Sequence, residues 1–178
     1  MPLSQQHLTE LQRYVAKVGM TASALRNLGA KGFVKVAIEF LSAVDLRQLA
    51  TTTPAAYPQW LDAQTTALTQ QFPLPNLWGP ARKAVNIFMV MASLNTFPRA
   101  EYGLDRFENV LEVPLDNTVV KKLRKFGRTQ KVFPRANFPK WESIKKLDPT
   151  NSAKHQQIAD VMSAQRGIPR GRLDVALF

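Results

Sequence analysis

Two side chains in this sequence, Lys83 and Asp116, have the types and settings that suit bond cleavage. Lys83 lies in the run from Trp78 to Phe88, which we interpret as a tight Gly/Pro turn opening directly into an apolar helix. Asp116 ends an apolar segment that begins at Glu112, and it precedes a sequence typical of a helix start. An amine and a carboxylate held by two such helix starts would suit nucleophilic and acid–base chemistry.

Asp116 is the candidate for electrostatic stabilisation and proton transfer. At a helix N-terminus, backbone N–H donors and the helix dipole favour the ionised form of an aspartate and fix its position. A carboxylate beside a sugar stabilises the positive charge that develops when a glycosidic bond breaks, and it can also accept a proton from an incoming nucleophile. The alternative for Asp116 is a plain helix N-cap with no chemical role.

Two nucleophiles, water and a lysine amine, would serve such a reaction. Attack by the amine of Lys83 on the sugar would give a Schiff base and permit strand cleavage after base loss. Partial burial at the start of an apolar helix would favour the neutral, nucleophilic amine. The alternative for Lys83 is a surface or phosphate-contacting lysine, and Arg82 would either favour the neutral amine of its neighbour or bind phosphate.

The distribution of charge predicts a polyanionic partner. The net charge is +11, and residues 117–146 hold seven Lys and three Arg against the single Glu142. Residues 101–116, by contrast, contain five carboxylates and one cation, Arg106. A basic segment beside an acidic one suggests a polyanion such as a nucleic acid on one face, with a carboxylate held near it. The alternative is a set of solvated helix faces.

We expect DNA contacts of two kinds. A glycine-bearing turn at a helix N-terminus exposes backbone N–H groups that suit a phosphate, and a basic helix would hold a second phosphate segment. The predicted DNA-binding residues are Gly79, Ala81, Arg82, Asn117, Thr118, Lys121, Lys122, Arg124 and Lys125. A base inside a duplex is out of reach, so it would have to be flipped into a pocket. The candidates for that pocket are Trp78, Asn86, Tyr57, Trp60, Phe72 and Tyr102.

Composition excludes several other chemistries. With no cysteine there is no thiolate nucleophile, disulfide or cysteine-ligated metal, and the two histidines, His7 and His155, have no metal-ligand spacing. We therefore expect no metal and no cofactor. No apolar run has membrane-spanning length and the N-terminus has no apolar signal-peptide core, which predicts a cytoplasmic protein without a membrane partner. We expect a monomer.

The elements that must position these residues are all helical. Apolar periodicity predicts helices over 8–18, 21–28, 33–44, 45–49, 54–72, 81–97, 104–111, 116–126, 140–147 and 151–166. Gly/Pro at 79–80, Pro98 and Gly127 are expected to act as breaks, and no segment alternates with period two as a strand would. His7 and His155 are expected to face solvent, Trp60 and Trp141 to anchor packing, and the apolar tail 173–178 to dock on the body.

The chain is of a length for one helical domain, 1–178. Within it we expect two halves. One comprises 22–112, with the hairpin near 73–97, and the other comprises 1–21 together with 113–178.

These motifs resemble the helix-hairpin-helix (HhH-GPD) superfamily of DNA glycosylases. Its members carry a Leu-Pro-Gly-Val-Gly-type hairpin, then Arg-Lys with an asparagine three residues on, and later a Val-Asp-Thr-His-Val-type segment. The matching positions here are Gly79, Arg82, Lys83, Asn86, the segment 115–119 and the pair Phe126-Gly127. Three positions depart from that pattern: Pro80, Ala81 in place of the second hairpin glycine, and Thr118 in place of the histidine. The long gap between the two motifs is similar to that of the archaeal oxoguanine branch.

The resemblance implies a compact glycosylase-like fold with a catalytic cleft between two helical halves. It implies an enzyme that flips out a modified base and cleaves its N-glycosidic bond, leaving an abasic site, with Asp116 as the shared aspartate and Lys83 as the lysine of members that also cleave the strand. Short, cysteine-free bacterial members of an anti-phage type remove glucosylated hydroxymethylcytosine, so the implied substrate is either a damaged base in repair or a hypermodified phage cytosine in antiviral defence. The alternative function is a non-catalytic DNA-binding protein that keeps the hairpin as a phosphate clamp.

Overall fold

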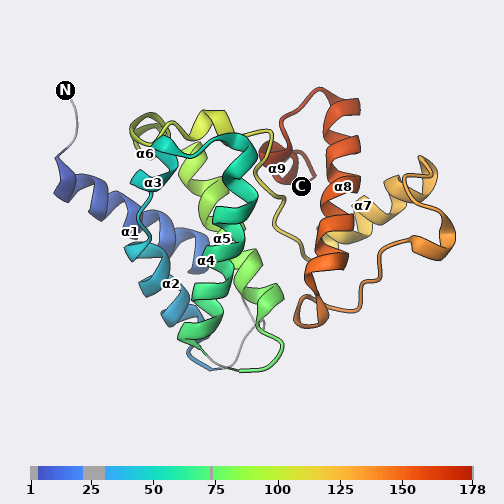
Figure 1. The fold of residues 1–178 in the computed structure, drawn as a ribbon, viewed down its shortest axis with the longest axis horizontal. Helices are drawn as coiled ribbons and strands as arrows, with labels where there is room; N and C mark the ends of the chain where they lie inside the picture. Colours follow the sequence, from blue (N-terminus) through green and yellow to red (C-terminus); the bar gives the residue numbers. More distant parts are fainter. Residues whose placement is uncertain (1–3, 22–30, 73, 178) are drawn as a thin grey trace.

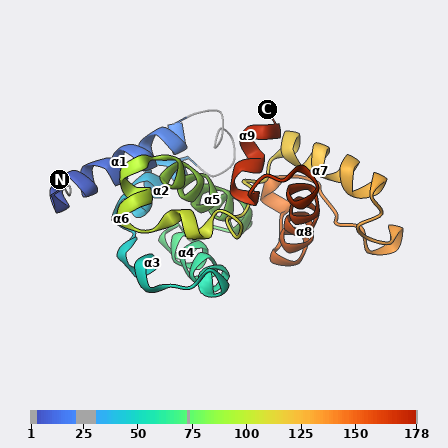
Figure 2. The same ribbon diagram turned by 90° about the horizontal axis from the view of Figure 1, so that it is seen from above.

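The described part of the chain, residues 4–21, 31–72 and 74–177 of a computed structural model, is built from α-helices, short 3-10 turns and loops, with no strand in it. The expected all-α class is therefore confirmed. The helices gather into two neighbouring lobes (Figures 1 and 2).

The first lobe, here called the N-terminal lobe, is built around a long apolar helix. It comprises α1 (Gln5–Thr21), α2 (Phe33–Ala43), α3 (Arg47–Thr51), α4 (Tyr57–Gln71), α5 (Trp78–Leu94) and α6 (Thr96–Glu101), with the turns η2 (Pro54–Ala56) and η3 (Leu104–Phe107). Helix α5 packs against α1, α2 and α4 and is apolar on almost every side, as expected of a central helix. Its fully buried side chains include Phe88 and Met89.

The second lobe, the C-terminal lobe, has its own hydrophobic cluster. It comprises α7 (Asn117–Thr129), α8 (Pro149–Arg166) and α9 (Leu173–Leu177), with the turns η4 (Arg135–Asn137), η5 (Ile144–Lys146) and η6 (Arg170–Arg172). Leu123 of α7 and Ile158 of α8 lie at the centre of this cluster, and Leu173 and Leu177 of the tail are buried in it. The predicted docking of the tail is thus confirmed.

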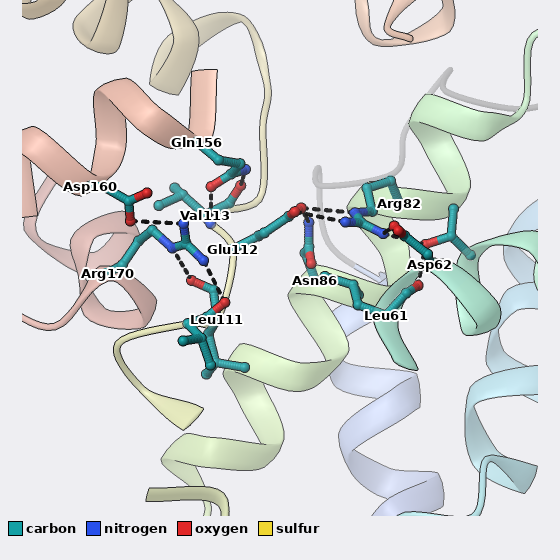
Figure 3. Close-up of polar contacts among 12 residues, drawn as sticks. Leu61, Asp62, Arg82, Asn86, Leu111, Glu112, Val113, Gln156, Asp160 and Arg170 are labelled. Atoms are coloured by element: carbon teal, nitrogen blue, oxygen red, sulfur yellow. Dashed lines mark hydrogen bonds and ion pairs between the residues drawn. The ribbon is translucent and has the colours of Figure 1, made fainter. Parts of the chain in front are cut away.

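An extended segment, 112–115, joins the lobes and is fixed by side chains of the C-terminal lobe (Figure 3). Gln156 of α8 donates to the carbonyl of Val113 at 2.9 Å and accepts from its N–H at 3.0 Å. Arg170 donates to the carbonyls of Leu111 at 2.8 Å and Val110 at 2.5 Å. The hydrogen bonds of Gln156 and Arg170 satisfy backbone groups of the chain here. They therefore hold the segment in place although it is not part of a helix or a sheet.

The expected division of the chain into halves is wrong at its N-terminus. Helix α1 packs on α2 and α5, and Val15, Ala16 and Met20 belong to the core of the N-terminal lobe rather than to that of the second half. The apolar stripe of α1 packs against the central helix α5 and not against α7 or α8 of the C-terminal lobe.

Three expected helix breaks are also wrong. Helix α5 begins at Trp78, so Gly79 and Pro80 lie in its first turn, where proline is tolerated; the turn before it is made by Pro75 and Asn76. That helix ends at Asn95, whose side chain caps α6, and Pro98 lies inside α6. Gly127 lies within α7 and does not end it. A residue without a side chain is needed there because Ile158 packs closely against this position.

Other boundaries differ less. Residues 54–72 form η2 followed by α4, residues 104–111 keep helical structure only in η3, and residues 140–147 only in η5. The helix expected over 21–28 lies outside the described residues, apart from Thr21 at the end of α1.

Candidate active site and nucleic-acid interface

Asp116 and Lys83 meet at the junction of the two lobes. Asp116 is the N-cap of α7: its Oδ1 accepts the N–H of Val119 at 2.9 Å. Its Oδ2 lies 3.5 Å from the Nζ of Lys83, which comes from the first turns of α5. The side chain of Lys83 is only 5% exposed and that of Asp116 is 32% exposed. The structure thus brings together the two residues that the sequence singled out, with the carboxylate on the solvent side.

Arg82 is turned away from solvent and is held by carboxylates. Its guanidinium makes a bidentate pair with Glu112, at 2.8 and 2.7 Å, and a further ion pair with Asp62 at 2.6 Å. Burial alone would lower the pKa of Arg82, but the hydrogen bonds and charges of Glu112 and Asp62 outweigh burial and raise it. Trp78 covers the guanidinium, with its ring 5.6 Å from the central carbon of that group.

This arrangement corrects the predicted phosphate clamp. Gly79, Ala81 and Arg82 are all buried, and the charge of Arg82 is already matched by two carboxylates. A Cβ on Gly79 would lie 2.0 Å from the carbonyl oxygen of Ile144, so this glycine permits close contact between α5 and η5 rather than a tight turn. In this structure Gly79 and Arg82 contact residues at the junction of the lobes and Ala81 belongs to the core of the N-terminal lobe, so none of the three is presented to a phosphate.

Asn86 completes the polar network of Arg82 and Glu112 (Figure 3). Asn86 lies one helical turn after Lys83 on α5, and its Nδ2 donates to the carboxylate of Glu112 at 3.0 Å. Its buried Oδ1 has no partner among the described residues. Glu112 therefore orders both Arg82 and Asn86. Sequence reasoning did not give Glu112 and Asp62 a role, because ion pairs across such sequence separations leave no periodic signal.

The predicted aromatic pocket divides into separate environments. Tyr57 and Trp60 are buried in the N-terminal lobe and stack on each other at 5.8 Å, and neither the Tyr57 hydroxyl nor the Trp60 Nε1 has a partner in the described part of the chain. Burial and the charge of Glu112 raise the pKa of Tyr57, which is consistent with its lying near that carboxylate. Phe72 packs edge-on against Phe33. Burial raises the pKa of the Tyr102 hydroxyl, on which the charges of Asp45 and Arg47 also act.

Helix α7 presents a basic face beyond Asp116. Val119, Val120 and Leu123 point into the C-terminal lobe, while the predicted DNA-binding residues Asn117, Thr118, Lys121 and Lys125 are exposed. Lys122 lies on another side of the helix and donates to the carbonyl of Leu177. Arg124 donates to the carbonyl of Pro139, and its guanidinium lies 5.4 Å from the ring of Phe138.

The two histidines differ in setting. His7 is exposed, as expected, but the expectation for His155 is wrong because its side chain is fully buried on α8. Its Nδ1 lies 2.8 Å from the carbonyl of Asn151 and its ring meets the edge of Trp141. The burial of His155 could have been predicted from its spacing in the sequence. His155, Ile158, Ala159 and Met162 recur at intervals of three and four, so they share the buried face of one helix.

Within the described residues, no group of three His, Cys, Asp or Glu side chains is placed to hold a metal ion, and no helix is long and apolar enough to cross a membrane. Comparison of the chain with protein-family models, with curated proteins and with solved structures finds no match.

Proposed function

We propose that this protein is a DNA glycosylase that excises a modified base. The observation that carries the proposal is the pairing of Asp116 Oδ2 with the buried Lys83 Nζ at 3.5 Å, beside a basic helix face. Carboxylate and amine would act on the C1′ atom of a nucleotide that is flipped out between the lobes. The resemblance of their motifs to the helix-hairpin-helix glycosylases supports the same reaction.

In the proposed reaction the bond between C1′ and the base nitrogen breaks, and its electron pair leaves with the base. The positive charge on the sugar is stabilised by Asp116, whose Oδ1 is held by the Val119 N–H while Oδ2 remains directed at the reacting centre. A water molecule then adds to C1′ and gives its proton to the carboxylate, leaving an abasic site.

Lys83 offers a second route from the same geometry. Proton transfer from Nζ to Asp116 would give a neutral amine, which bonds to C1′ as the base leaves with the electron pair and a proton. The sugar ring then opens as Asp116 returns its proton to the ring oxygen O4′, which gives a protonated Schiff base from which the strand can be cleaved. The two routes differ in one property, a covalent protein–DNA intermediate.

Base recognition would fall to the partly unsatisfied polar groups near this pair. The Oδ1 of Asn86 is a buried acceptor without a partner in the described structure, one turn from Lys83. An unpaired buried acceptor is costly, and a donor such as the exocyclic amine of a base would satisfy it. A damaged base in repair and a hypermodified phage cytosine in defence both remain substrate candidates of this proposal.

The first test is base release from a panel of DNAs, measured by mass spectrometry. The panel holds oxidised, alkylated and deaminated bases and heavily modified phage genomes. Asp116→Asn is the informative variant because asparagine is as good an N-cap as aspartate, so α7 keeps its start while the charge is lost. We expect release to fall about 100-fold or more, the scale of losing one preorganised charge-stabilising group.

Asp148→Asn provides the matched control for this variant. Asp148 caps α8 with the same geometry, accepting the N–H of Asn151 at 2.8 Å, but it is remote in sequence from the Lys83 pair. Unchanged release in Asp116→Asn would refute the role of Asp116. No release from any DNA, with salt-sensitive binding intact, would favour the non-catalytic DNA-binding protein instead.

Borohydride trapping distinguishes the two nucleophiles. If Lys83 is the nucleophile, reduction during turnover yields a covalent protein–DNA complex that disappears in Lys83→Gln and persists in Lys35→Gln, an exposed control on α2. Base release without any trapped complex assigns the nucleophile to water. A complex that persists in Lys83→Gln would remove this lysine from the reaction.

A further inference from the structure

A basic groove runs along α7 on the side that faces the segment 131–142. Two hollows, of about 660 and 530 Å³, share Arg124 and Arg128 in their walls and so meet at these two side chains. We name the two hollows together the α7 groove. It reaches Asn117, the residue next to Asp116, so one end of the groove opens beside the candidate active site.

Cations line this groove with little to balance them. Helix α7 contributes Lys121, Arg124, Lys125 and Arg128, and the facing segment contributes Lys131, Arg135 and Lys140. The carboxylate in its walls is Glu142. None of these seven cations is within ion-pair distance of a carboxylate in the part of the chain that the structure describes.

Four arginines elsewhere in the fold differ from those of the groove. Arg82, Arg99, Arg170 and Arg172 are each paired with an aspartate or glutamate at 2.6–2.8 Å. In the α7 groove, burial and the neighbouring charge of Arg128 together lower the pKa of Arg124. Cations that crowd one another in a hollow favour an anion with several regularly spaced charges, such as a phosphodiester chain.

Aromatic rings alternate with the cations. Phe133, Phe138 and Trp141 line the groove, each half-buried. Phe138 is covered by the guanidiniums of Arg124 and Arg128 at 5.4 and 5.3 Å, and the Nε1 of Trp141 is fixed by Asn117 Oδ1 at 2.9 Å. The half-buried rings of Phe133 and Trp141 and the guanidinium planes over Phe138 offer stacking surfaces to unpaired bases. A duplex keeps its bases stacked on one another and would use only the cations.

From these observations we infer that the α7 groove binds a single strand of DNA, with its phosphates on the cations and its bases against the aromatic rings. The choice of DNA as the strand rests on the proposed function. A strand lying in the groove would pass Asn117 and so present a nucleotide at Asp116. The protein would then act on unpaired or locally opened DNA.

Binding of fluorescein-labelled oligonucleotides, followed by fluorescence anisotropy, tests this inference without using base release. The protein carries Asp116→Asn so that no reaction occurs, and a 12-nucleotide strand is compared with its duplex. We expect the single strand to bind at least tenfold more tightly. Equal or tighter binding of the duplex would overturn the inference, whatever the outcome for glycosylase activity.

Phe133→Leu separates stacking from charge. Leucine keeps an apolar side chain against the C-terminal lobe, so the fold is retained, but it removes the ring on which a base would stack. We expect single-strand binding to weaken about fivefold or more, with duplex binding unchanged. An equal effect on both DNAs, or none on the single strand, would contradict stacking.

The double variant Arg128→Gln/Lys131→Gln tests the phosphate contacts. Loss of two phosphate contacts on a single strand lowers the slope of log affinity against log salt by about 1.4. The matched control is Arg13→Gln/Lys17→Gln, which removes two exposed cations of α1 in the other lobe. The same change of slope in both double variants would mean that net charge alone, and not this groove, attracts DNA.

Discussion

At the scale of single residues, Arg82 does more for the fold than for any ligand. Its guanidinium is nearly inaccessible and is satisfied by Glu112, Asp62 and the hydroxyl of Thr65. Glu112 belongs to the segment that leads to Asp116, so this ion pair fixes the start of α7 relative to α5. The position of Asp116 relative to Lys83, the proposed catalytic pair, therefore depends on a salt bridge that no motif reveals.

We expect Arg82→Ala to lower the free energy of unfolding by about 3–5 kcal/mol, because it leaves the carboxylate of Glu112 partly buried without its partner. Urea titration followed by circular dichroism measures this. Arg47→Ala is the control: its ion pair with Asp45 is exposed to solvent, so this variant should lose much less stability. Equal losses in the two variants would show that the Arg82 network does not stabilise the fold.

His155 predicts how stability depends on pH. Burial, together with the charge of Arg124, lowers the pKa of His155 below its ordinary value of 6.5, although its hydrogen bond to Asn151 acts in the opposite direction. The unfolded chain therefore binds a proton at a higher pH than the folded chain. The stabilisation by neutral His155 is complete above pH 6.5 and is lost as the pH falls from 6.5 towards the folded-state pKa.

The measurement is the free energy of unfolding at several pH values between 7.5 and 5, for the native protein and for His155→Gln. We expect the native protein to lose stability with a slope of at most about 1.4 kcal/mol per pH unit from this group, and the variant to lack that part of the slope. Parallel curves for the two proteins would contradict the assignment to His155.

At the scale of elements, the contact between α5 and η5 positions Lys83. Gly79 lies against the backbone of Ile144, where a methyl group would come within 2.0 Å of a carbonyl oxygen. We expect Gly79→Ala to destabilise the protein by about 3 kcal/mol or more, because backbone cannot move aside as a side chain can. Thermal unfolding and base release should both be impaired, since the start of α5 must shift.

Gly19→Ala is the matched control for that variant. Gly19 is also helical, but among the described residues its added methyl would meet side-chain atoms alone, the Cγ2 of Ile87 at 3.2 Å and the Cγ of Met91 at 3.8 Å. Alanine favours a helix over glycine by about 1 kcal/mol, so the net change in unfolding free energy should be within about 1 kcal/mol. If Gly19→Ala lost as much unfolding free energy as Gly79→Ala, the close contact with the Ile144 backbone would not explain the effect of Gly79→Ala.

The same elements show what sequence can predict here and what it cannot. The N-cap at Asp116, the buried central helix and the all-α class follow from local patterns, and the structure confirms them. Gly79 and Gly127 were misread as breaks because a glycine required by packing looks the same in sequence as one required by a turn. The α7 groove was visible only as an excess of charge, since its shape depends on how residues 131–142 fold back along α7.

At the scale of the whole molecule, two hydrophobic clusters are joined by one extended segment. Gln156 satisfies both backbone groups of Val113 in that segment, and it is 4% exposed. The segment carries Glu112 before Val113 and leads directly to Asp116, the N-cap of α7. Movement of this segment would thus separate the two carboxylates from Arg82 and Lys83 together.

We expect Gln156→Leu to loosen the junction before it unfolds either lobe. The variant leaves the N–H and carbonyl of Val113 without partners, at a cost of about 1–3 kcal/mol for each group. Hydrogen exchange at the Val113 amide should become much faster, while amides in the middle of α5 keep their protection. Gln165→Leu, an exposed position on the same helix, should leave both rates unchanged. If Val113 keeps its protection in Gln156→Leu, Gln156 does not hold the junction, and the ion pairs of Glu112 and the contacts of Arg170 must do so instead.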